Sequence, residues 1–406
     1  MLQSHDKTFD LLTPSALRNP HPVLAQMRAE APVYHSQHIE QSEYPYILTR
    51  YDDTVVLLKD DVFTKDPFKR PVPEGFTPNI DMNMMAINRH LLTVDPPDHT
   101  RLRTLVHKAF TPKMVREFEG RVQAIADGLI DAMLQKSQVD LITDYATPLP
   151  LTVIAELLGV PSSDQADFRR WSQTILTEVA REGGDMEATA AAALEFIMYF
   201  HALFEERRQN PREDLISGLV QVEENGEMLD PQELISMVFL LLAAGHETTV
   251  NLIGNGTLAL LTHPDQHALL IAQPELITSA VEEMLRFNGP IGVTSVRWAM
   301  EDVTLHGVTI PKGGMVLASL LAANRDPSVF ENPDVFDITR DPNRHMAFGN
   351  GIHYCLGAPL ARMEGAVAIR TLLRRVPNLA LAVDVDALEW TETLLLHGMK
   401  SMPCTV

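Results

Sequence analysis

The chain has 406 residues, a hydrophobic content of 45% and a formal net charge of −21. So acidic a chain argues against binding to nucleic acid or to anionic membranes, because both carry negative charge themselves. Only two cysteines occur, Cys355 and Cys404, which excludes a disulfide framework and predicts a reducing compartment.

The sequence predicts one domain over residues 1–406, since no linker rich in Pro, Gly or Ser and no low-complexity segment interrupts it. The first residues lack the pattern of a signal peptide. The longest apolar run, residues 237–244, is far shorter than the roughly 20 residues that a membrane-spanning helix needs. We therefore expect a soluble, cytoplasmic protein that does not bind membranes.

The first part of the chain mixes short elements. Apolar periodicity predicts helices over 21–30 and 52–59, and strand patterns occur at 32–35 and 46–48. Periodicity fades over 60–92, where Pro, Asn and Met accumulate. Such a segment in a compact domain is typically a lid or binding loop, and methionines suit an adaptable apolar surface. An irregular segment without a binding role is the alternative.

Two prolines behind an acidic residue, at 95–97, predict the start of a helix that runs to residue 110. His99 and Arg103 are four residues apart and therefore share one face of that helix. The pair can hold an anion, but for the pair taken alone a solvated helix face without function is the favoured explanation. From 111 to 224 the apolar residues recur mostly at helical spacing.

A capping-box pattern at 230–233 predicts the start of the longest helix, which ends before residue 263. Its first half, 234–245, is apolar nearly all round and is expected to run through the core. The run Gly-His-Glu-Thr-Thr at 245–249 interrupts it. Gly costs about 1 kcal/mol within a helix, and a buried carboxylate costs more unless it is satisfied. This local conflict predicts a functional site, with a polar kink as the alternative.

The last third combines a helix, strands and a loop. Residues 274–287 predict a helix on which Glu283 and Arg286 share a face. Strand patterns follow at 292–298, 303–305 and 308–310, and residues 315–322 fit strand or helix. Irregular sequence over 326–344 then leads to the loop Phe-Gly-Asn-Gly-Ile-His-Tyr-Cys-Leu-Gly at 348–357, which we call the Cys loop.

Cys355 ends this loop just before a predicted helix that begins near Ala358. Free N–H groups and the positive end of a helix dipole favour thiolate over thiol, so the sulfur is predicted to be a nucleophile or a metal ligand. A Cys–His nucleophile pair with His353 lacks an evident orienting residue. A multi-Cys zinc site lacks cysteines, a zinc-protease helix lacks its second His, and a dinucleotide fingerprint lacks its third Gly.

The Cys loop resembles the haem-binding signature of the cytochrome P-450 family. The run Ala-Gly-His-Glu-Thr-Thr at 244–249 resembles the family's oxygen-activating helix motif, and Glu283 with Arg286 resembles its structural Glu-x-x-Arg motif. Resemblance to soluble bacterial-type members extends from about Pro20 to the C-terminus. It implies a mainly α fold with a small β lobe, a triangular prism with a long central helix over haem b.

The resemblance implies that Cys355 ligates the haem iron, since thiolate donation favours O–O cleavage. The implied cofactor-binding residues are His99, Arg103, Ala244, Arg297, Phe348, His353, Cys355 and Gly357. Glu247 and Thr248 are implied to relay protons through water. Family members that use peroxide directly typically lack this acid–alcohol pair, which favours a monooxygenase supplied with electrons. Glu283, Arg286 and Arg340 are implied to be structural.

Electrons are expected from separate partners, because two cysteines cannot hold an iron–sulfur cluster and no flavin segment is fused. The resemblance implies a ferredoxin and its reductase, with the P-450 acting as a monomer. We expect an acidic ferredoxin to dock on a basic patch of Arg101, Lys108, Lys113 and Arg344, despite the net negative charge.

The expected substrate is a lipophilic small molecule, because the candidate contacts are apolar and offer few hydrogen-bonding groups. Core packing is the alternative for each of them. These candidates are Met82, Met84, Met85, Ile87, Leu240, Val293, Thr294, Leu395 and Leu396. The predicted reaction inserts one oxygen atom from O2 into a C–H bond. A non-catalytic haem sensor or carrier, a peroxygenase, and a member catalysing epoxidation or bond formation are the alternatives.

Overall fold

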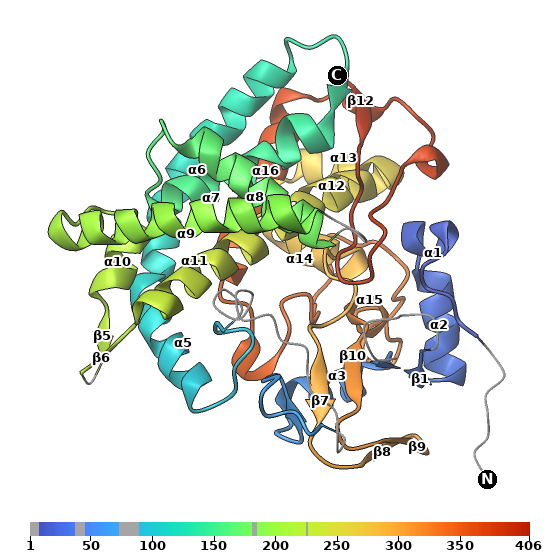
Figure 1. The fold of residues 1–406 in the computed structure, drawn as a ribbon. Helices are drawn as coiled ribbons and strands as arrows, with labels where there is room; N and C mark the ends of the chain where they lie inside the picture. Colours follow the sequence, from blue (N-terminus) through green and yellow to red (C-terminus); the bar gives the residue numbers. More distant parts are fainter. Residues whose placement is uncertain (1–7, 37–44, 73–88, 181–184, 225) are drawn as a thin grey trace. The chain divides into compact units, whose positions relative to one another are not determined.

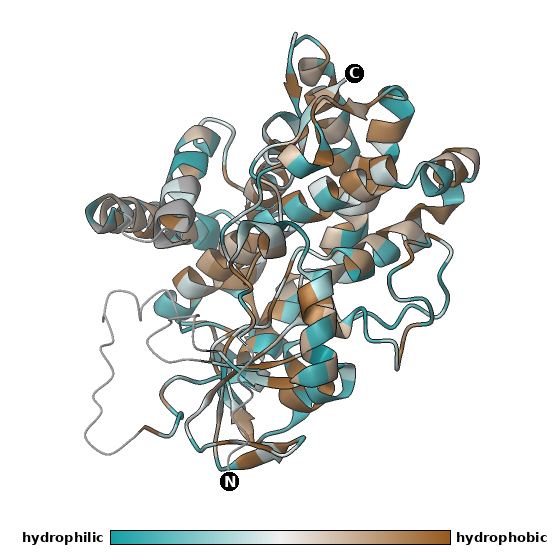
Figure 2. Ribbon diagram, turned by 90° about the vertical axis from the view of Figure 1, so that its right-hand side faces the viewer, coloured by the Kyte–Doolittle hydropathy of each residue, from teal (hydrophilic) through white to brown (hydrophobic). Residues whose placement is uncertain are grey.

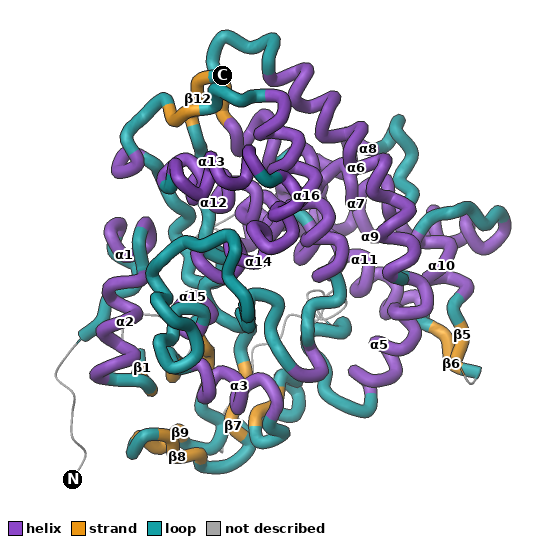
Figure 3. The backbone as a smooth tube through the Cα atoms, turned by 180° about the vertical axis from the view of Figure 1, so that it is seen from behind, coloured by secondary structure: helices purple, strands orange, loops and turns teal. Residues whose placement is uncertain are grey.

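The computed structural model describes residues 8–36, 45–72, 89–180, 185–224 and 226–406 (Figure 1). The chain divides into two compact units. The first unit contains Met1–Phe76, Ala126–Ala146 and Thr248–Val406. The second unit contains Thr77–Ile125 and Thr147–Glu247. Most of the trace is helical and the strands are short (Figure 3). This confirms the prediction of a mainly α protein with a small β part.

The largest sheet belongs to the first unit and has the strand order β1-β2-β10-β7-β3. β10 is its central strand, parallel to β2 and antiparallel to β7. Alternate strand residues pack with Leu57 of α3 and form one apolar cluster, in which Leu48, Phe63 and Val316 are buried. The strands are β1 (Val33–His35), β2 (Tyr46–Leu48), β3 (Phe63–Thr64), β7 (Arg297–Ala299) and β10 (Met315–Ala318).

Short helices surround this sheet and the start of the chain. α2 and α15 contact each other, and α15 also contacts α3 (Figure 1). Three further strands form a second sheet in the order β11-β12-β4, and β8 pairs with β9 as a hairpin. These elements are α1 (Pro14–Arg18), α2 (His21–Glu30), α3 (Tyr51–Lys59), α15 (Leu320–Ala323), β4 (Val139–Asp140), β8 (Val303–Leu305), β9 (Val308–Ile310), β11 (Ala380–Leu381) and β12 (Pro403–Thr405).

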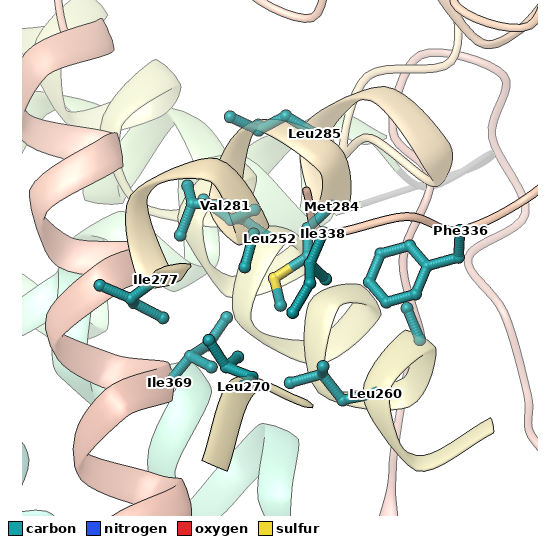
Figure 4. Close-up of a cluster of buried hydrophobic side chains, with 12 residues drawn as sticks. Leu252, Leu260, Leu270, Ile277, Val281, Met284, Leu285, Phe336, Ile338 and Ile369 are labelled. Carbon is teal, nitrogen blue, oxygen red and sulfur yellow. The ribbon is translucent and has the colours of Figure 1, made fainter. Parts of the chain in front are cut away.

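The helical core of the first unit is a cluster of twelve buried apolar residues (Figure 4). Leu252, Val281 and Ile369 of this cluster come from three different helices (Figure 4). The twelve residues come from α12 (Glu247–Thr262), α13 (Pro264–Ala272), α14 (Ile277–Phe287), α16 (Ala358–Arg375) and the segment with Phe336 and Ile338, and η2 (Pro274–Leu276) packs against them. Three single turns complete the unit: η1 (Ile142–Ala146), η3 (Gly351–His353) and η4 (Val385–Ala387).

The second unit is almost entirely helical. α9 packs along α8, and both contact α11. A run of rings stabilises these contacts: Phe196 lies 4.6 Å from Phe200 and 6.2 Å from Phe239 of α11. Its elements are α5 (Asp98–Ala109), α7 (Pro148–Leu158), α8 (Gln165–Ala180), α9 (Met186–Gln209), α10 (Leu215–Gln221), β5 (Glu223–Glu224), β6 (Glu227–Met228) and α11 (Pro231–Gly245). α6 (Pro112–Met133) begins in this unit and ends in the first.

Hydrophobic and hydrophilic residues alternate along most helices, as expected where each helix buries one face (Figure 2). The helices predicted over 21–30 and 52–59 are confirmed within one residue, and residues 315–322 form a strand followed by a helix. The strand predicted over 292–298 was too long, because only Arg297–Ala299 pairs as a strand there and residues 291 and 293 form isolated bridges.

The stretch Pro231–Thr262 is long and apolar enough to cross a membrane by length and composition alone. However, 56% of its most apolar window is buried inside the structure, as in the core helix of a globular protein.

Candidate active site

The Cys loop ends at the start of α16 and holds Cys355 in a tight turn. The Cys355 N–H donates to the Phe348 carbonyl at 3.0 Å, and the Gly349 N–H donates to the Met346 carbonyl at 2.8 Å. Gly349 and Gly351 adopt φ values of +73° and +74°, which other residues rarely adopt. These bonds fix the half-buried Cys355 side chain in a loop with little conformational freedom.

The Cys loop, α3 and β7 meet at the carbonyl of Leu58. A Cβ atom added to Gly351 would lie only 2.6 Å from this oxygen, so only glycine permits the approach. Arg297 Nη2 lies 3.5 Å from the same oxygen, at the outer limit of a hydrogen bond. The structure therefore brings Arg297, which is 4% exposed, close to the turn that contains His353.

Phe348 is fixed by a polar network that the sequence did not reveal. The Arg362 guanidinium lies 4.4 Å from the centre of the Phe348 ring and donates to Glu282 at 2.7 and 2.8 Å. Glu282 also accepts from His345 at 3.0 Å. Burial alone would raise the pKa of Glu282, but these hydrogen bonds outweigh it and lower the pKa to about 2.

This network joins α14, the segment before the Cys loop, and α16. Glu282 and Arg362 are 80 residues apart, so no local spacing rule connects them. The local Glu-x-x-Arg spacing on this helix indicates the neighbouring Glu283 and does not indicate Glu282.

Glu283 and Arg286 of α14 are fully buried and form a bidentate pair at 2.7 and 2.8 Å. Arg340 approaches Glu283 at 3.2 Å, and Asn343 donates to it at 3.1 Å. Arg286 also donates to three backbone carbonyls of residues 324–335. The structure thus brings all three predicted structural residues together, where they fix the segment that leads to the Cys loop.

The long predicted helix is interrupted at one residue. α11 ends at Gly245, His246 occupies the cap position, and α12 begins at Glu247 rather than after residue 249 as expected. His246 Nδ1 lies 3.3 Å from the Leu242 carbonyl, and burial lowers the pKa of this imidazole. Burial raises the pKa of the half-buried Glu247, which favours its protonated form.

Exposure along α11 differs from the expectation of complete burial. Residues 234–238 and 242 are buried, but Leu240 is half-buried and Ala244 is exposed. These two residues are four apart and share a face of the helix. α12, in contrast, is buried continuously from Thr249 to Leu260, whereas Thr248 is half-buried. The motif therefore lies between the partly exposed C-terminal end of α11 and the fully buried stretch of α12.

His99 and Arg103 lie on α5 in the second unit. His99 is 3% exposed and Arg103 is half-buried. Between them along the helix, Arg101 forms a salt bridge with Glu233, the capping-box residue of α11. This contact fixes α5, and with it the predicted anion-binding pair, against the start of α11.

α12 crosses α16 at a glycine. A Cβ atom on Gly365 would come within 2.8 Å of Leu252, so the two helices touch closely at this point. Thr248 lies one turn before Leu252, and Cys355 lies before the first turn of α16. The crossing fixes the helix that carries Thr248 against the helix that follows the Cys loop.

Four of the predicted substrate contacts lie in two adjacent segments of the first unit. The Gly292 N–H donates to the Leu395 carbonyl at 2.9 Å, and Ile291 forms a bridge with Leu396. Val293 and Thr294 are each 6% exposed, and the Thr294 hydroxyl accepts from the Ala318 N–H at 3.0 Å. Leu395 is exposed. The other four candidates from the Met-rich segment, Met82, Met84, Met85 and Ile87, lie outside the described residues.

The proposed docking cations are not equally available. Arg101 is bound by Glu233 and lies 3.6 Å from Glu227, so acidic partners neutralise it. Lys108 and Lys113 are exposed on the second unit, and Arg344 belongs to the first. Arg101 is therefore the least available of these cations, whereas Lys108 and Arg344 are exposed and Lys113 has a solvent-exposed pair with Glu117 at 3.6 Å.

The Cys loop fits a cofactor held by one sulfur. A Cβ atom added to Gly349 or Gly357 would meet no atom of the described residues within 4 Å, so there is open space along the loop. The donor set consists of one half-buried thiol at a helix N-terminus, with Arg297 and His353 nearby. A thiol donor and cations suit an iron porphyrin that carries anionic side groups.

Comparison with known proteins decides the family. The model of the family described as cytochrome P-450 matches residues 151–272 and 270–377. The chain belongs to the cytochrome P-450 family. A polyketide-biosynthesis cytochrome P-450, PksS, of Bacillus subtilis is 43% identical over 410 residues, covering 100% of this chain and 98% of that protein. A vitamin D(3) 25-hydroxylase of Pseudonocardia autotrophica is 44% identical, covering 98% and 96%.

Solved structures agree with this P-450 fold. The structure of Bacillus subtilis PksS gives a TM-score of 0.90 at 42% identity and covers 98% of this chain and 99% of that chain. A myxobacterial cytochrome P-450 in complex with myristic acid gives 0.88 at 46% identity, covering 97% and 98%. The protein is a haem-thiolate monooxygenase of the bacterial type that uses O2, lipophilic substrates and separate redox partners.

Proposed function

We propose that Cys355 is the thiolate ligand of haem b in this P-450. The observation that carries the proposal is a half-buried thiol at the N-terminus of α16, beside open space at Gly357. The other cysteine is a poor candidate, because burial raises the pKa of Cys404 to about 11 and keeps it a thiol. When bound, the haem supplies the activation of O2 that hydroxylates the substrate.

The other residues proposed to contact the haem are assigned from their charge and their position. His99, Arg103, Arg297 and His353 would bind the haem propionates, because each can offer N–H donors to a carboxylate. Phe348 would pack beside the sulfur, where Arg362 fixes its ring. The N–H groups of the first turn of α16, from Gly357 onward, would stabilise the thiolate charge. Ala244, which is small and exposed, would leave room for the ring.

Glu247 and Thr248 would supply protons during the reaction. Because burial raises the pKa of Glu247, its carboxyl can hold a proton nearer to neutral pH than an exposed glutamate can. The half-buried Thr248 hydroxyl, the next residue along α12, would orient the water that accepts this proton. The two residues would therefore deliver protons while the rest of α12 excludes solvent.

The substrate is proposed to be a lipophilic molecule whose C–H bond is hydroxylated. Relatives are named for polyketide biosynthesis, for vitamin D(3) 25-hydroxylation and as a 6-deoxyerythronolide B hydroxylase, and one solved relative is in complex with myristic acid. Fatty acid, terpenoid, steroid and polyketide substrates are all candidates. The segments 291–294 and 394–397 are hydrogen-bonded neighbours, which supports placing their four candidate residues in one substrate site. The same candidate contacts are proposed: Met82, Met84, Met85, Ile87, Leu240, Val293, Thr294, Leu395 and Leu396. Epoxidation or bond formation at the same site is the second candidate reaction.

We further propose a cytoplasmic monomer that folds as one P-450 domain over residues 1–406. Alignment with the PksS relative along the full chain supports the single domain. A ferredoxin and its reductase are the proposed electron donors, because the chain holds too few cysteines for a cluster of its own.

The carbon monoxide complex of the reduced enzyme tests the ligand. Thiolate ligation by Cys355 predicts a strongly red-shifted Soret band in the wild type and its loss in Cys355→Ser. Cys404→Ser, the matched control, should keep the red-shifted band. A wild-type protein with an ordinary haem–CO band, or a Cys355→Ser variant that retains the shifted band, would show that another group binds the iron.

A further inference from the structure

A cavity lies in the first unit, and none of the proposed haem contacts lines it. It has a volume of about 670 Å³, within the range of small-molecule sites. Its walls come from α1, α2, α12, the end of α14 and the turn η4. The apolar part of the lining includes Val23, Leu258 and Phe287.

Three polar side chains of the lining carry a buried atom without a hydrogen-bond partner among the described residues. These atoms are Nδ1 of His21, Oδ1 of Asn255 and Nε1 of Trp390. Asn255 and Trp390 are only 2% and 8% exposed. An unsatisfied buried polar atom costs about 1–3 kcal/mol, a penalty that a bonding partner, whether water or a ligand, removes. A ligand that reaches them through a small rotation of His21 or Trp390 would remove it.

The hydrogen bonds around these three atoms show whether each one needs a donor or an acceptor from a ligand. Asn255 Nδ2 donates to the carbonyls of Asn288 and His397 at 3.1 and 2.8 Å, which leaves its Oδ1 as an acceptor. Asn288 Oδ1 lies 3.3 Å from His21 Nε2 and 2.9 Å from His397 Nε2, so both nitrogens act as donors to it. Trp390 stacks on His397 with ring centres 4.4 Å apart.

Both imidazoles are neutral. Burial, followed by the charge of Arg325, lowers the pKa of His397 to about 3 and lowers the pKa of His21 well below its ordinary value. A neutral His21 that donates from Nε2 has an acceptor at Nδ1. The three atoms without a partner are therefore two hydrogen-bond acceptors, on His21 and Asn255, and one hydrogen-bond donor, on Trp390.

We propose that this cavity is a second ligand site for an uncharged molecule that combines an amide or a similar donor–acceptor group with an apolar body. A primary amide matches the three atoms, because its NH2 group donates twice and its carbonyl accepts once. An anionic group fits less well, because Arg18 pairs with Asp386, Arg325 pairs with Asp334, and the other charged residue of the lining, Asp10, is itself acidic. The site is distinct from the proposed haem contacts and independent of the proposed substrate.

Benzamide is the probe, and benzoate, which has nearly the same shape but only acceptors and a negative charge, is its control. The holoenzyme is labelled with 5-fluorotryptophan, which places a fluorine at each of the three tryptophans. Benzamide should shift the Trp390 resonance, assigned with Trp390→Phe, and leave those of Trp171 and Trp298 in place. Benzoate should bind at least about tenfold more weakly, as expected for the loss of two donated hydrogen bonds.

Two variants test the location. His21→Leu removes one acceptor and should weaken benzamide about tenfold, while His267→Leu on α13, outside the cavity lining, should not. Ser15→Tyr narrows the cavity without touching the polar set and should also weaken binding. Equal binding of benzamide and benzoate, or unchanged benzamide affinity in both cavity variants with intact haem spectra, would overturn the proposal.

Discussion

Thr248 and Thr249 are neighbours on α12 but differ in exposure: Thr248 is half-buried and Thr249 is 2% exposed. If Thr248 orients water for proton delivery, replacing it by valine removes the hydroxyl while keeping the shape. We expect Thr248→Val to consume reductant at a near-normal rate while product per reductant falls several-fold and peroxide release rises. The measurement is the ratio of product to reductant, with peroxide assayed in parallel.

Thr249→Val is the matched control and should leave this ratio nearly unchanged, because its side chain is packed in the core. Equal losses in the two variants would point to a general disturbance of α12 instead of a role for the Thr248 hydroxyl.

Glu364 of α16 is a second residue whose environment yields a prediction. It is 1% exposed, its Oε2 has no hydrogen-bond partner among the described residues, and burial raises its pKa to about 8. Between pH 4.5 and about 8 the folded protein keeps a proton that the unfolded chain releases. The stability that this carboxyl contributes is therefore full below pH 4.5 and is lost as the pH rises towards 8.

Glu364→Gln should remove this part of the pH dependence. At pH 5 the variant should unfold near the wild-type temperature, and at pH 9 it should unfold several degrees higher, because the buried charge is gone. Thermal unfolding at the two pH values measures this, with Glu275→Gln, an exposed site, as control. Parallel behaviour of wild type and Glu364→Gln would mean that Glu364 is not buried as a neutral acid.

The Cys loop is the element whose geometry depends most on single glycines. Gly351 combines a φ of +74° with a carbonyl 2.6 Å from the position of a Cβ atom, whereas Gly120 on α6 would meet no described atom within 4 Å. Gly351→Ala should therefore displace the loop and reduce haem occupancy and thermal stability. Gly120→Ala should be neutral or stabilise by about 0.5–1 kcal/mol, since alanine is the better helix former.

The ratio of haem absorbance to protein, together with thermal unfolding, measures both effects. Normal haem content in Gly351→Ala would show that the contact with Leu58 does not set the position of the loop.

At the scale of the whole molecule, the net charge of −21 leaves few places where an acidic redox partner can approach. Lys108 and Lys113 are the exposed members of the predicted patch that belong to the second unit. Reversing both charges to glutamate should slow reduction by an acidic ferredoxin about tenfold at low ionic strength and flatten its salt dependence. The rate of haem reduction as a function of salt is the measurement.

The double variant Lys136→Glu/Lys312→Glu changes the net charge equally, at two lysines of the first unit, and should slow reduction much less. If both double variants slowed reduction to the same degree, overall repulsion rather than docking on the second unit would explain the effect.

The sequence by itself determined the family, the positions of most helices, and the two motifs around Cys355 and Glu247–Thr248. These features are local: helical periodicity, a capping box at Asp230 and a glycine-rich loop can be recognised within about ten residues of chain. Glu283 and Arg286 were found for the same reason, because three residues separate them on one helix.

Only the tertiary structure decided what depends on contacts between distant segments. The Glu282–Arg362 pair spans 80 residues, and the cavity beside His21, Asn255 and Trp390 joins three parts of the chain. No periodicity encodes such contacts, since they arise when packed elements bring side chains together. The interruption of the long helix at the single residue His246 also depends on tertiary packing. So does the exposure of Ala244, because the neighbouring segments decide which turns of the helix are covered.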